Sequence, residues 1–201
     1  MLRSEKDPAR REEVKRALRA HVPETWKEGP TLCLGCGDGF ELDILCERGF
    51  KNVHGITNDP DEAAARPGVF LGDIHDMNMF GAGEFSFIYS KECLEHLISP
   101  WCALLEMNRI LKPGGEFVHL ISCGIEKQRE TYHLSCFPDW LWFDLLHKAG
   151  FETTKILDGH ATEIGFVGRK IREAEPHLKP EQYSYNLRAM FNGVARETIV
   201  L

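Results

Sequence analysis

No apolar run in this sequence approaches the roughly 18 residues that a membrane-spanning helix requires. The first residues, MLRSEKDPARREEVKR, also lack the apolar segment that a secretory signal peptide carries. The 201 residues are 43% hydrophobic and 27% charged, an ordinary composition for a globular domain with a substantial core. We therefore expect a protein without a membrane span that stays in the cytoplasm.

The sequence also lacks an excess of positive charge. Its 24 Lys and Arg residues are outnumbered by 31 Asp and Glu residues, which gives a formal net charge of −7. Because the phosphates of nucleic acids attract basic surfaces, this balance argues against a nucleic-acid partner. A small-molecule partner is favoured.

A cysteine framework is missing as well. The seven cysteines are an odd number and are scattered through apolar segments, unlike the dense disulfide pattern of small secreted domains. Cys33 and Cys36 have the CxxC spacing of a zinc ligand pair, but the sequence has no second pair at such spacing. We predict that the seven cysteines are reduced, that Cys33 and Cys36 are small buried apolar groups, and that no metal is bound.

Short apolar runs alternate with helical patterns from residue 30 onward. Runs typical of strands cover residues 31–34, 53–57, 69–71, 85–89, 116–122, 151–158 and 164–169. Helices are predicted over residues 40–48, 99–111 and 138–149, with a sharp turn at 112–115 after the second. This alternation predicts an α/β fold, a doubly wound and mostly parallel sheet with helices on both faces.

Two helical segments flank this region. Asp7 and Pro8 have the order of an N-cap followed by proline at the first helical position. The tail over residues 180–201 has apolar residues at helical spacing and predicts a final amphipathic helix. We divide the chain into an N-terminal helical extension (1–29), a central domain (30–170) and a C-terminal helical extension (171–201). The final helix is expected to pack on its own domain, with a homodimer contact or a cover over the substrate pocket as alternatives.

Three glycines at alternate positions, in the stretch GCGDG at 35–39, follow the first predicted strand. Glycine allows backbone conformations and close approaches that other residues do not. The carboxyl end of a strand that leads into a helix is also where ligands bind in an open α/β sheet. A nicotinamide dehydrogenase is one alternative, but its GxGxxG fingerprint requires glycine where Phe40 stands.

Four blocks of sequence, in order, resemble the class I S-adenosylmethionine-dependent methyltransferases. They are LCLGCGDG at 32–39, Gly72-Asp73, FSFIYS at 85–90 with Leu94-Glu95-His96, and LKPGG at 111–115. The resemblance covers about residues 30–170, the methyltransferase domain of our division. It implies a seven-stranded sheet with an antiparallel last strand, and S-adenosylmethionine as cofactor. It also implies transfer of the cofactor's methyl group to an oxygen or nitrogen atom of an unidentified small-molecule acceptor.

The resemblance further implies a set of cofactor contacts. The glycine turn would lie against the methionine end of the cofactor, and Asp73 would accept a hydrogen bond from the adenine amino group. The residues that end the fourth strand would line the cofactor and the reacting methyl group. The residues so assigned are Gly35, Cys36, Gly37, Asp38, Gly39, Asp73, Ile74, Tyr89, Ser90 and Lys91. A simple turn residue is the alternative for Asp73.

Two positions depart from the family pattern. Cys33 stands where an acid commonly precedes the first glycine by two residues, and Thr57 stands where an acid usually ends the second strand and binds the ribose hydroxyls. We predict that Thr57, Asn58 and Asp59 contact the ribose, with Asp59 as the substitute acid and a plain turn role as its alternative. The two departures also leave open a catalytically silent protein that binds S-adenosylmethionine or regulates another protein.

Histidines are the candidate catalytic residues. His133 lies just before the helix predicted at 138–149, where relatives often have a histidine near the acceptor. An imidazole with an ordinary pKa of about 6.5 can take a proton from an oxygen or nitrogen acceptor, although His133 can instead anchor its loop. His96 is the second candidate, and His160 is a weaker candidate for lining the pocket.

A metal is the remaining alternative for this region. Glu92, Glu95 and His96 resemble the metal-contacting stretch of some ubiquinone-pathway O-methyltransferases, and two carboxylates with an imidazole suit a divalent ion. Leu-Glu-His is, however, widespread in metal-free relatives. We therefore retain the prediction of a site without metal.

Overall fold

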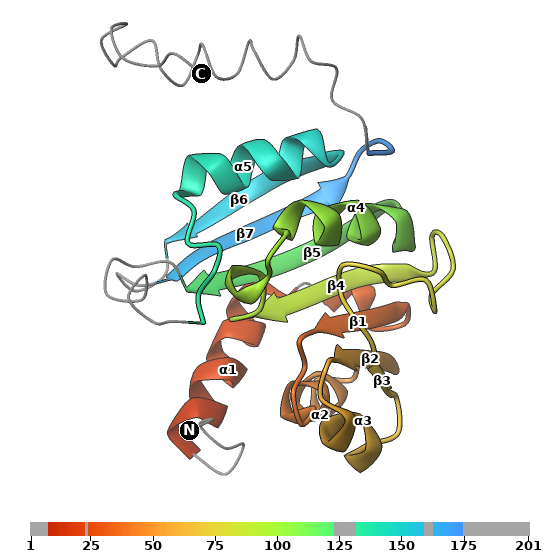
Figure 1. The fold of residues 1–201 in the computed structure, drawn as a ribbon. Coiled ribbons are helices and arrows are strands. Elements are labelled where there is room, and N and C mark those ends of the chain that lie inside the picture. The colour runs from red at the N-terminus through yellow and green to blue at the C-terminus, as the bar shows by residue number, and fades with distance from the viewer. Residues whose placement is uncertain (1–7, 23, 123–131, 159–162, 175–201) are drawn as a thin grey trace, which may run out of the picture.

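The computed structural model describes residues 8–22, 24–122, 132–158 and 163–174 (Figure 1). Its strands are β1 (Pro30–Leu34), β2 (Asn52–Thr57), β3 (Val69–Leu71), β4 (Phe85–Lys91), β5 (Leu111–Ser122), β6 (Phe151–Asp158) and β7 (Glu163–Lys170). Its α-helices are α1 (Pro8–His21), α2 (Phe40–Glu47), α3 (Pro60–Ala65), α4 (Pro100–Ile110) and α5 (Asp139–Lys148), with short 3-10 helices η1 (Glu24–Trp26) and η2 (Leu94–His96). Within these ranges, no helix has the length and apolar character needed to cross a membrane.

The seven strands form one sheet in the order β3-β2-β1-β4-β5-β7-β6. The pairs among β1 to β5 are parallel, whereas β7 pairs antiparallel with both β5 and β6. The strand order reverses at β1, because β2 and β3 extend the sheet on one side and β4 and β5 on the other. The predicted doubly wound sheet with an antiparallel last strand is confirmed.

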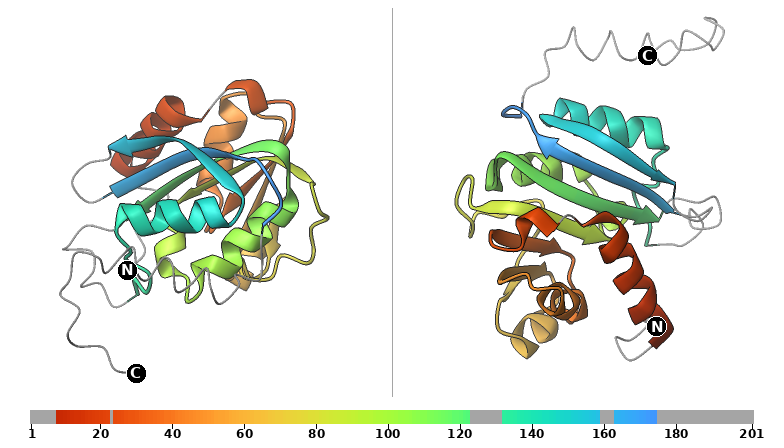
Figure 2. Two further views of the ribbon diagram at one scale, coloured as in Figure 1. Left: turned by 90° about the horizontal axis from the view of Figure 1, so that it is seen from above. Right: turned by 180° about the vertical axis from the view of Figure 1, so that it is seen from behind.

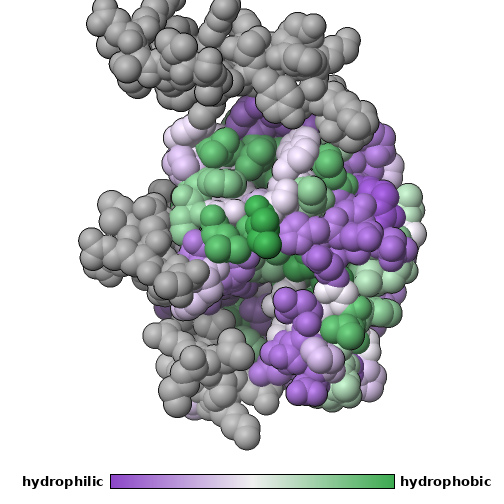
Figure 3. Space-filling model, in the orientation of Figure 1, coloured by the Kyte–Doolittle hydropathy of each residue, from purple (hydrophilic) through white to green (hydrophobic). Residues whose placement is uncertain are grey.

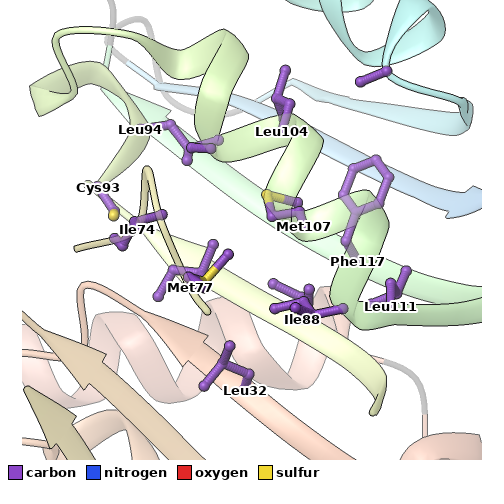
Figure 4. Packing of buried hydrophobic residues seen from close by; sticks show 14 of the residues in the cluster. Leu32, Ile74, Met77, Ile88, Cys93, Leu94, Leu104, Met107, Leu111 and Phe117 are labelled. Atoms are coloured by element: carbon purple, nitrogen blue, oxygen red, sulfur yellow. The ribbon is translucent and has the colours of Figure 1, made fainter. Parts of the chain in front are cut away.

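Alternate residues of the strands contribute to two hydrophobic cores. Figure 2 shows the helices that cover the two faces of the sheet. In β1, Leu32 and Leu34 belong to the core shared with α4 and α5, and Cys33 belongs to the core shared with α1 and α2. Figure 4 shows part of the first of these cores, in which Met107 of α4 lies toward Ile88 of β4. The sheet thus carries helices on both faces, as the near-continuous apolar strands predict.

The helix α1 is fixed to the rest of the molecule by its apolar face and by α2. Val14 and Leu18 are fully buried in the second core. The guanidinium of Arg48, just after α2, donates hydrogen bonds to the backbone oxygens of Leu18 at 2.5 Å and Val22 at 3.1 Å. Although α1 lies in the predicted N-terminal extension, it shares the core of the sheet, and the division into three segments stays a prediction.

Two elements differ from the sequence prediction. The helix α3 was not predicted, because its six residues include none that is buried and so show no apolar periodicity. The strand β5 begins at Leu111, earlier than predicted, because Leu111 pairs with Phe85 before the register shifts and Phe87 pairs with Glu116. The residues 112–115 are therefore an irregularity inside β5 and not a turn that precedes it. The predicted helix over 180–201 and His160 lie outside the described residues.

Candidate functional site

Many of the predicted site residues lie where three neighbouring parallel strands end, and Asp73 and Ile74 follow a fourth strand, β3. Leu34, the last residue of β1, is level with Ile56 of β2 on one side and with Ser90 of β4 on the other. The glycine turn after β1, the residues after Thr57 and the residues after Lys91 therefore meet at one edge of the sheet. This edge is the point where the strand order reverses, which is where open α/β sheets bind ligands.

The glycine turn has a backbone that other residues rarely adopt. Gly35, Gly37 and Gly39 have φ values of 62°, 53° and 81°. The N–H of Cys36 donates to Ile56 O at 3.1 Å and ties the turn to β2, and the N–H of Gly39 donates to Cys36 O at 2.9 Å. The Asp38 carboxylate folds back to the first helical residue of α2, where Phe40 N donates to its Oδ1 at 3.3 Å.

Of these three glycines, only Gly37 has no atom of the described residues closer than ordinary van der Waals contact to the position of an added Cβ. A Cβ added at Gly35 would lie 2.7 Å from Cys93 Sγ, and one at Gly39 would lie 2.6 Å from the Arg66 side chain. A Cβ at Gly37 would meet only the Glu62 carboxylate, at 3.7 Å. The backbone at Gly37 is therefore a cradle that a side chain would fill, and it fits a cofactor whose methionine end approaches the turn closely.

The residues after β2 form a hydrogen-bonded chain. Thr57 Oγ1 donates to Glu62 Oε2 at 2.7 Å and accepts from Asp59 N at 3.3 Å. Asp59 is the N-cap of α3, and its Oδ1 accepts from Asp61 N at 2.8 Å and Glu62 N at 3.3 Å. Sequence reasoning did not single out Glu62, although its place three residues after an Asp-Pro helix start was a readable signal. The ribose contacts predicted for Thr57, Asn58 and Asp59 stay predictions.

A second carboxylate lies beside the other departure from the family pattern. Cys33 Sγ donates to Glu41 Oε2 at 3.3 Å, and both residues are buried. Burial, and then the charge of Glu41, raise the pKa of the Cys33 thiol well above its ordinary value. The sequence analysis did not predict a role for Glu41, because only the fold brings the first turn of α2 next to Cys33 of β1. The chain thus has an acid near each place where the motif lacks one.

The predicted adenine residue, Asp73, is already engaged by a neighbour. Its Oδ1 accepts from His75 N at 2.9 Å and lies 2.6 Å from His75 Nδ1, and these bonds lower the pKa of the carboxyl. Ser99 N donates to His75 Nε2 at 3.2 Å, so Nδ1 carries the proton of this ring. Ile74 is buried in the first core. The adenine contact stays a prediction, with His75 as the residue that orients Asp73.

The side chains of the residues at the end of β4 are buried. Tyr89 packs in the second core, and the Ser90 hydroxyl lies 2.7 Å from Nδ1 of the buried His119. Lys91 Nζ donates to Glu92 Oε1 at 3.1 Å. Glu92 has a φ of 49°, and a non-glycine residue in this strained conformation is typical of functional sites. The cofactor contacts predicted for Tyr89, Ser90 and Lys91 stay predictions.

The two candidate catalytic histidines lie together. The ring centroids of His96 and His133 are 4.7 Å apart, and the ring of Tyr132 stacks on that of His96 at 5.5 Å. His96 Nδ1 lies 3.0 Å from the backbone oxygen of Tyr132. Because a carbonyl oxygen only accepts, Nδ1 must carry a proton, and Nε2 of the neutral ring is left as the proton acceptor.

Glu95 fastens this cluster to the sheet. Its Oε1 accepts from Ser122 N at 2.7 Å at the end of β5, and its backbone oxygen accepts from Leu134 N and Ser135 N, both at 2.9 Å. The residue is fully buried, and burial raises the pKa of its carboxyl to about 7. Sequence reasoning named Glu95 as part of the Leu-Glu-His element of the family and as a possible metal ligand, but it did not predict these contacts.

Metal-ligand types also meet in this cluster. Glu95, His96 and His133 each offer one ligand atom, and the three atoms lie within 4.8 Å of one another. This grouping replaces the Glu92 of the sequence alternative by His133. The prediction of a site without metal stays a prediction.

Comparison with known proteins gives two kinds of match. Residues 32–119 match a family model described as Methyltransferase domain. The chain is also 26% identical over 153 residues to a mouse protein named EEF1A lysine methyltransferase 4. That match covers 64% of this chain and 59% of the mouse protein, so the chain spans little more than half of this curated relative.

Solved structures share the fold at low sequence identity. A SAM dependent methyltransferase from Archaeoglobus fulgidus superposes with a TM-score of 0.67 at 17% identity, covering 80% of this chain and 94% of that one. A structure described as the [4+2]-cyclase SpnF has a TM-score of 0.68 at 15% identity, covering 86% of this chain and 85% of that one. Together with the family match, the fold implies S-adenosylmethionine as the cofactor.

Gly37 provides the most direct test of the cradle. Gly37→Val places a branched side chain in the open space above the turn, and we expect S-adenosylhomocysteine to bind roughly tenfold or more weakly in isothermal titration calorimetry. Gly83→Val is the matched control, because Gly83 also has a positive φ of 64° but has nothing within 4 Å of an added Cβ. Equal affinities for Gly37→Val and the wild type would contradict the assignment.

Glu95 generates a prediction about pH. Its folded pKa of about 7 lies above the ordinary 4.5, so the folded state binds more protons between these values and loses stability as pH rises through them. Glu95→Gln removes this loss, because glutamine does not titrate. The free energy of unfolding of the variant minus that of wild type should therefore increase by up to about 3 kcal/mol between pH 4.5 and pH 7.

The comparison between variant and wild type matters for this test. Burial lowers the pKa of His119 from 6.5 to about 3, so His119 contributes stability that is lost as pH falls through 6.5, the opposite slope. The His119 contribution is present in both proteins, so it cancels when their free energies of unfolding, measured by denaturant titration from pH 4.5 to 7, are subtracted. A difference that does not change with pH would show that the Glu95 carboxyl titrates normally.

Proposed function

We propose that the chain is a class I S-adenosylmethionine-dependent methyltransferase and that it transfers a methyl group to an oxygen or nitrogen atom of a small-molecule acceptor. The observation that carries the proposal is the open backbone at Gly37 on the same sheet edge as the His96 and His133 pair. A cradle for the methyl donor and a pair of proton acceptors at neighbouring strand ends are the two parts that such a transfer needs.

The residues around the turn fit the cofactor. When bound, S-adenosylmethionine supplies an activated methyl group, because its sulfonium is a good leaving group. The protein then has to orient the acceptor and exclude water. The glycine turn binds the methionine end through backbone that allows close approach. Asp73, oriented by His75, accepts from the adenine amino group.

The histidines remove the acceptor's proton. His96 is held by its Nδ1–H, which donates to the backbone oxygen of Tyr132, and its Nε2 accepts the proton from an acceptor oxygen or nitrogen. His133 lies beside this ring and contributes a second imidazole at the same place. Glu95 keeps both positions fixed, since it accepts hydrogen bonds from β5 and from the loop that follows His133.

Exposed apolar side chains flank the histidines and favour an acceptor with apolar or aromatic character. Tyr132 is 59% exposed, Leu134 is 56% exposed and Ile98 is 84% exposed. Apolar side chains also gather on the molecular surface over α4 and α5 (Figure 3), where Trp140 and Phe143 of α5 are exposed. A molecule with a ring and one ionisable oxygen or nitrogen would cover such side chains while presenting its acceptor atom to His96.

Two other functions are weighed against this one. A catalytically silent binding protein is suggested by Cys33 and Thr57 at usually acidic positions, but the carboxylates of Glu41 and Glu62 beside them weaken that reason. A protein lysine acceptor is suggested by the name of the mouse relative. Since fold alone does not determine chemistry, the acceptor has to be found by experiment.

The histidines allow a prediction about turnover. In His96→Asn the amide nitrogen can still donate to Tyr132 O, but the proton acceptor at Nε2 is gone, so we expect kcat to fall about 100-fold or more while S-adenosylhomocysteine affinity is unchanged. His147→Asn, in an exposed position on α5, is the control and should keep full activity. A fall in kcat for His133→Asn alone would assign the base to His133, and full activity in both variants would remove the base from the proposal.

Radiolabel from [methyl-³H]S-adenosylmethionine shows which acceptor is used. We expect the label in small phenols, amines or imidazoles of a substrate panel, with a fall in labelling for His96→Asn. Label that appears only in protein after incubation with a cell extract would favour the lysine alternative. Cofactor binding without any labelled product would favour the silent binding protein.

A further inference from the structure

The carboxylate predicted to bind the ribose has another task in the structure. Asp59 caps the N-terminus of α3, and its Oδ1 accepts both the Asp61 N–H at 2.8 Å and the Glu62 N–H at 3.3 Å. An N-cap of this kind contributes to the stability of the helix, here directly after β2. The side chain is thereby directed to the helix end, and a ribose bound to the same oxygen would compete with the cap.

The hydroxyl of Thr57 is committed in the same way. It donates to Glu62 Oε2 at 2.7 Å and accepts from Asp59 N at 3.3 Å. A hydroxyl has one proton to donate, and that proton is used by Glu62. Thr57 is buried at the end of β2, so its main effect is to fix where the Glu62 carboxylate lies.

The Glu62 carboxylate faces the glycine turn. An added Cβ at Gly37 would lie 3.7 Å from Glu62 Oε1 and 4.0 Å from Oε2, with no other atom within 4 Å. Oε2 receives the Thr57 proton, and among the described residues no hydrogen bond to Oε1 is present. The acid thus lies across the open space at the turn, between the ends of β1 and β2, where the cofactor has to pass from its methionine end to its ribose.

We propose that Glu62 is the acid that binds the ribose hydroxyls of the cofactor, and that Thr57 is the residue that positions it. The proposal rests on the proposed function, because it presupposes that S-adenosylmethionine binds at this edge. A carboxylate accepts hydrogen bonds from both hydroxyls of a vicinal diol, and such bonds to a charged group are the stronger kind. The acid is supplied from α3, five positions after Thr57, instead of from the end of β2 itself.

A purely structural role for Glu62 predicts a different contact. Glu62 is the third residue of α3 after its N-cap Asp59, the position whose side chain in a capping box reaches back to the backbone N–H of the N-cap. Here the Asp59 N–H donates to Thr57 Oγ1, and Glu62 receives the hydroxyl proton of Thr57. The carboxylate is thereby displaced from the helix end toward Gly37.

Two substitutions that each remove one negative charge separate the candidates. Glu62→Gln retains an oxygen that can accept from Thr57, and Asp59→Asn retains a good N-cap. We expect Glu62→Gln to weaken S-adenosylhomocysteine binding in calorimetry by about 10- to 100-fold, and Asp59→Asn to leave it within about twofold of wild type. Thr57→Val should weaken binding and Thr57→Ser should restore it, since serine keeps the hydroxyl that positions Glu62.

A second ligand shows whether the ribose is the contact. The 2′,3′-dideoxy analogue of S-adenosylhomocysteine lacks both hydroxyls, so it should bind wild type and Glu62→Gln with similar affinity, whereas the parent compound distinguishes them. Equal loss of both ligands in Glu62→Gln would overturn the proposal, because Glu62 would then act on the site as a whole. Unchanged affinity in Glu62→Gln with a loss in Asp59→Asn would return the role to Asp59.

The proposed function fails in a recognisably different way. If wild type binds neither S-adenosylmethionine nor S-adenosylhomocysteine, the cofactor site itself is overturned, and the role of Glu62 with it. If wild type binds both and Glu62→Gln binds them equally well, only the role of Glu62 is overturned.

Discussion

The hydrogen bond from Cys36 N to Ile56 O, at 3.1 Å, is the constraint on which the site depends. It ties the turn after β1 to the neighbouring strand while the chain passes through left-handed backbone at Gly37 and then enters α2. Because Gly37 carries no side chain, backbone is the surface that the turn presents at this position. The places of Glu41 behind the turn and Glu62 opposite it both follow from that geometry.

Two carboxylates near this edge of the sheet accept hydrogen bonds from neutral side chains on the strands. Cys33 and Thr57 stand where strands of the family usually carry acids, and each donates to a carboxylate from the next helix, Glu41 and Glu62. The strand residue donates a hydrogen bond to a carboxylate whose own backbone belongs to the following helix. This hydrogen bond fixes the orientation of the carboxylate. Position along the motif alone thus does not show where the carboxylates lie in this fold.

Much of the fold could be predicted from the sequence, because apolar strand runs and helix stop signals report directly on burial and backbone conformation. β3 and β6 begin and end as predicted, and the antiparallel last strand followed from the family resemblance. The helix α3 could not be found by periodicity, since it buries no side chain. Glu62 and Glu41 were missed for a related reason: spacing places each in the first turn of a helix, but it does not show which strand side chain the carboxylate contacts. The glycine turn, in contrast, was readable because its chemistry is local.

Glu95 connects the histidine cluster, His96 and His133, to the strand ends of the sheet. Burial of this carboxyl is unfavourable enough to raise its pKa to about 7, so a core made only for stability would favour an apolar residue here. Its retention is explained by what it joins: Ser122 at the end of β5, η2 directly after β4, and the loop that follows His133. Because β4 lies next to β1, the element that carries His96 begins at the same sheet edge as the glycine turn. In-line methyl transfer, as proposed for this chain, needs fixed distances between donor and acceptor, and we infer that this buried polar anchor contributes to them at a cost in stability.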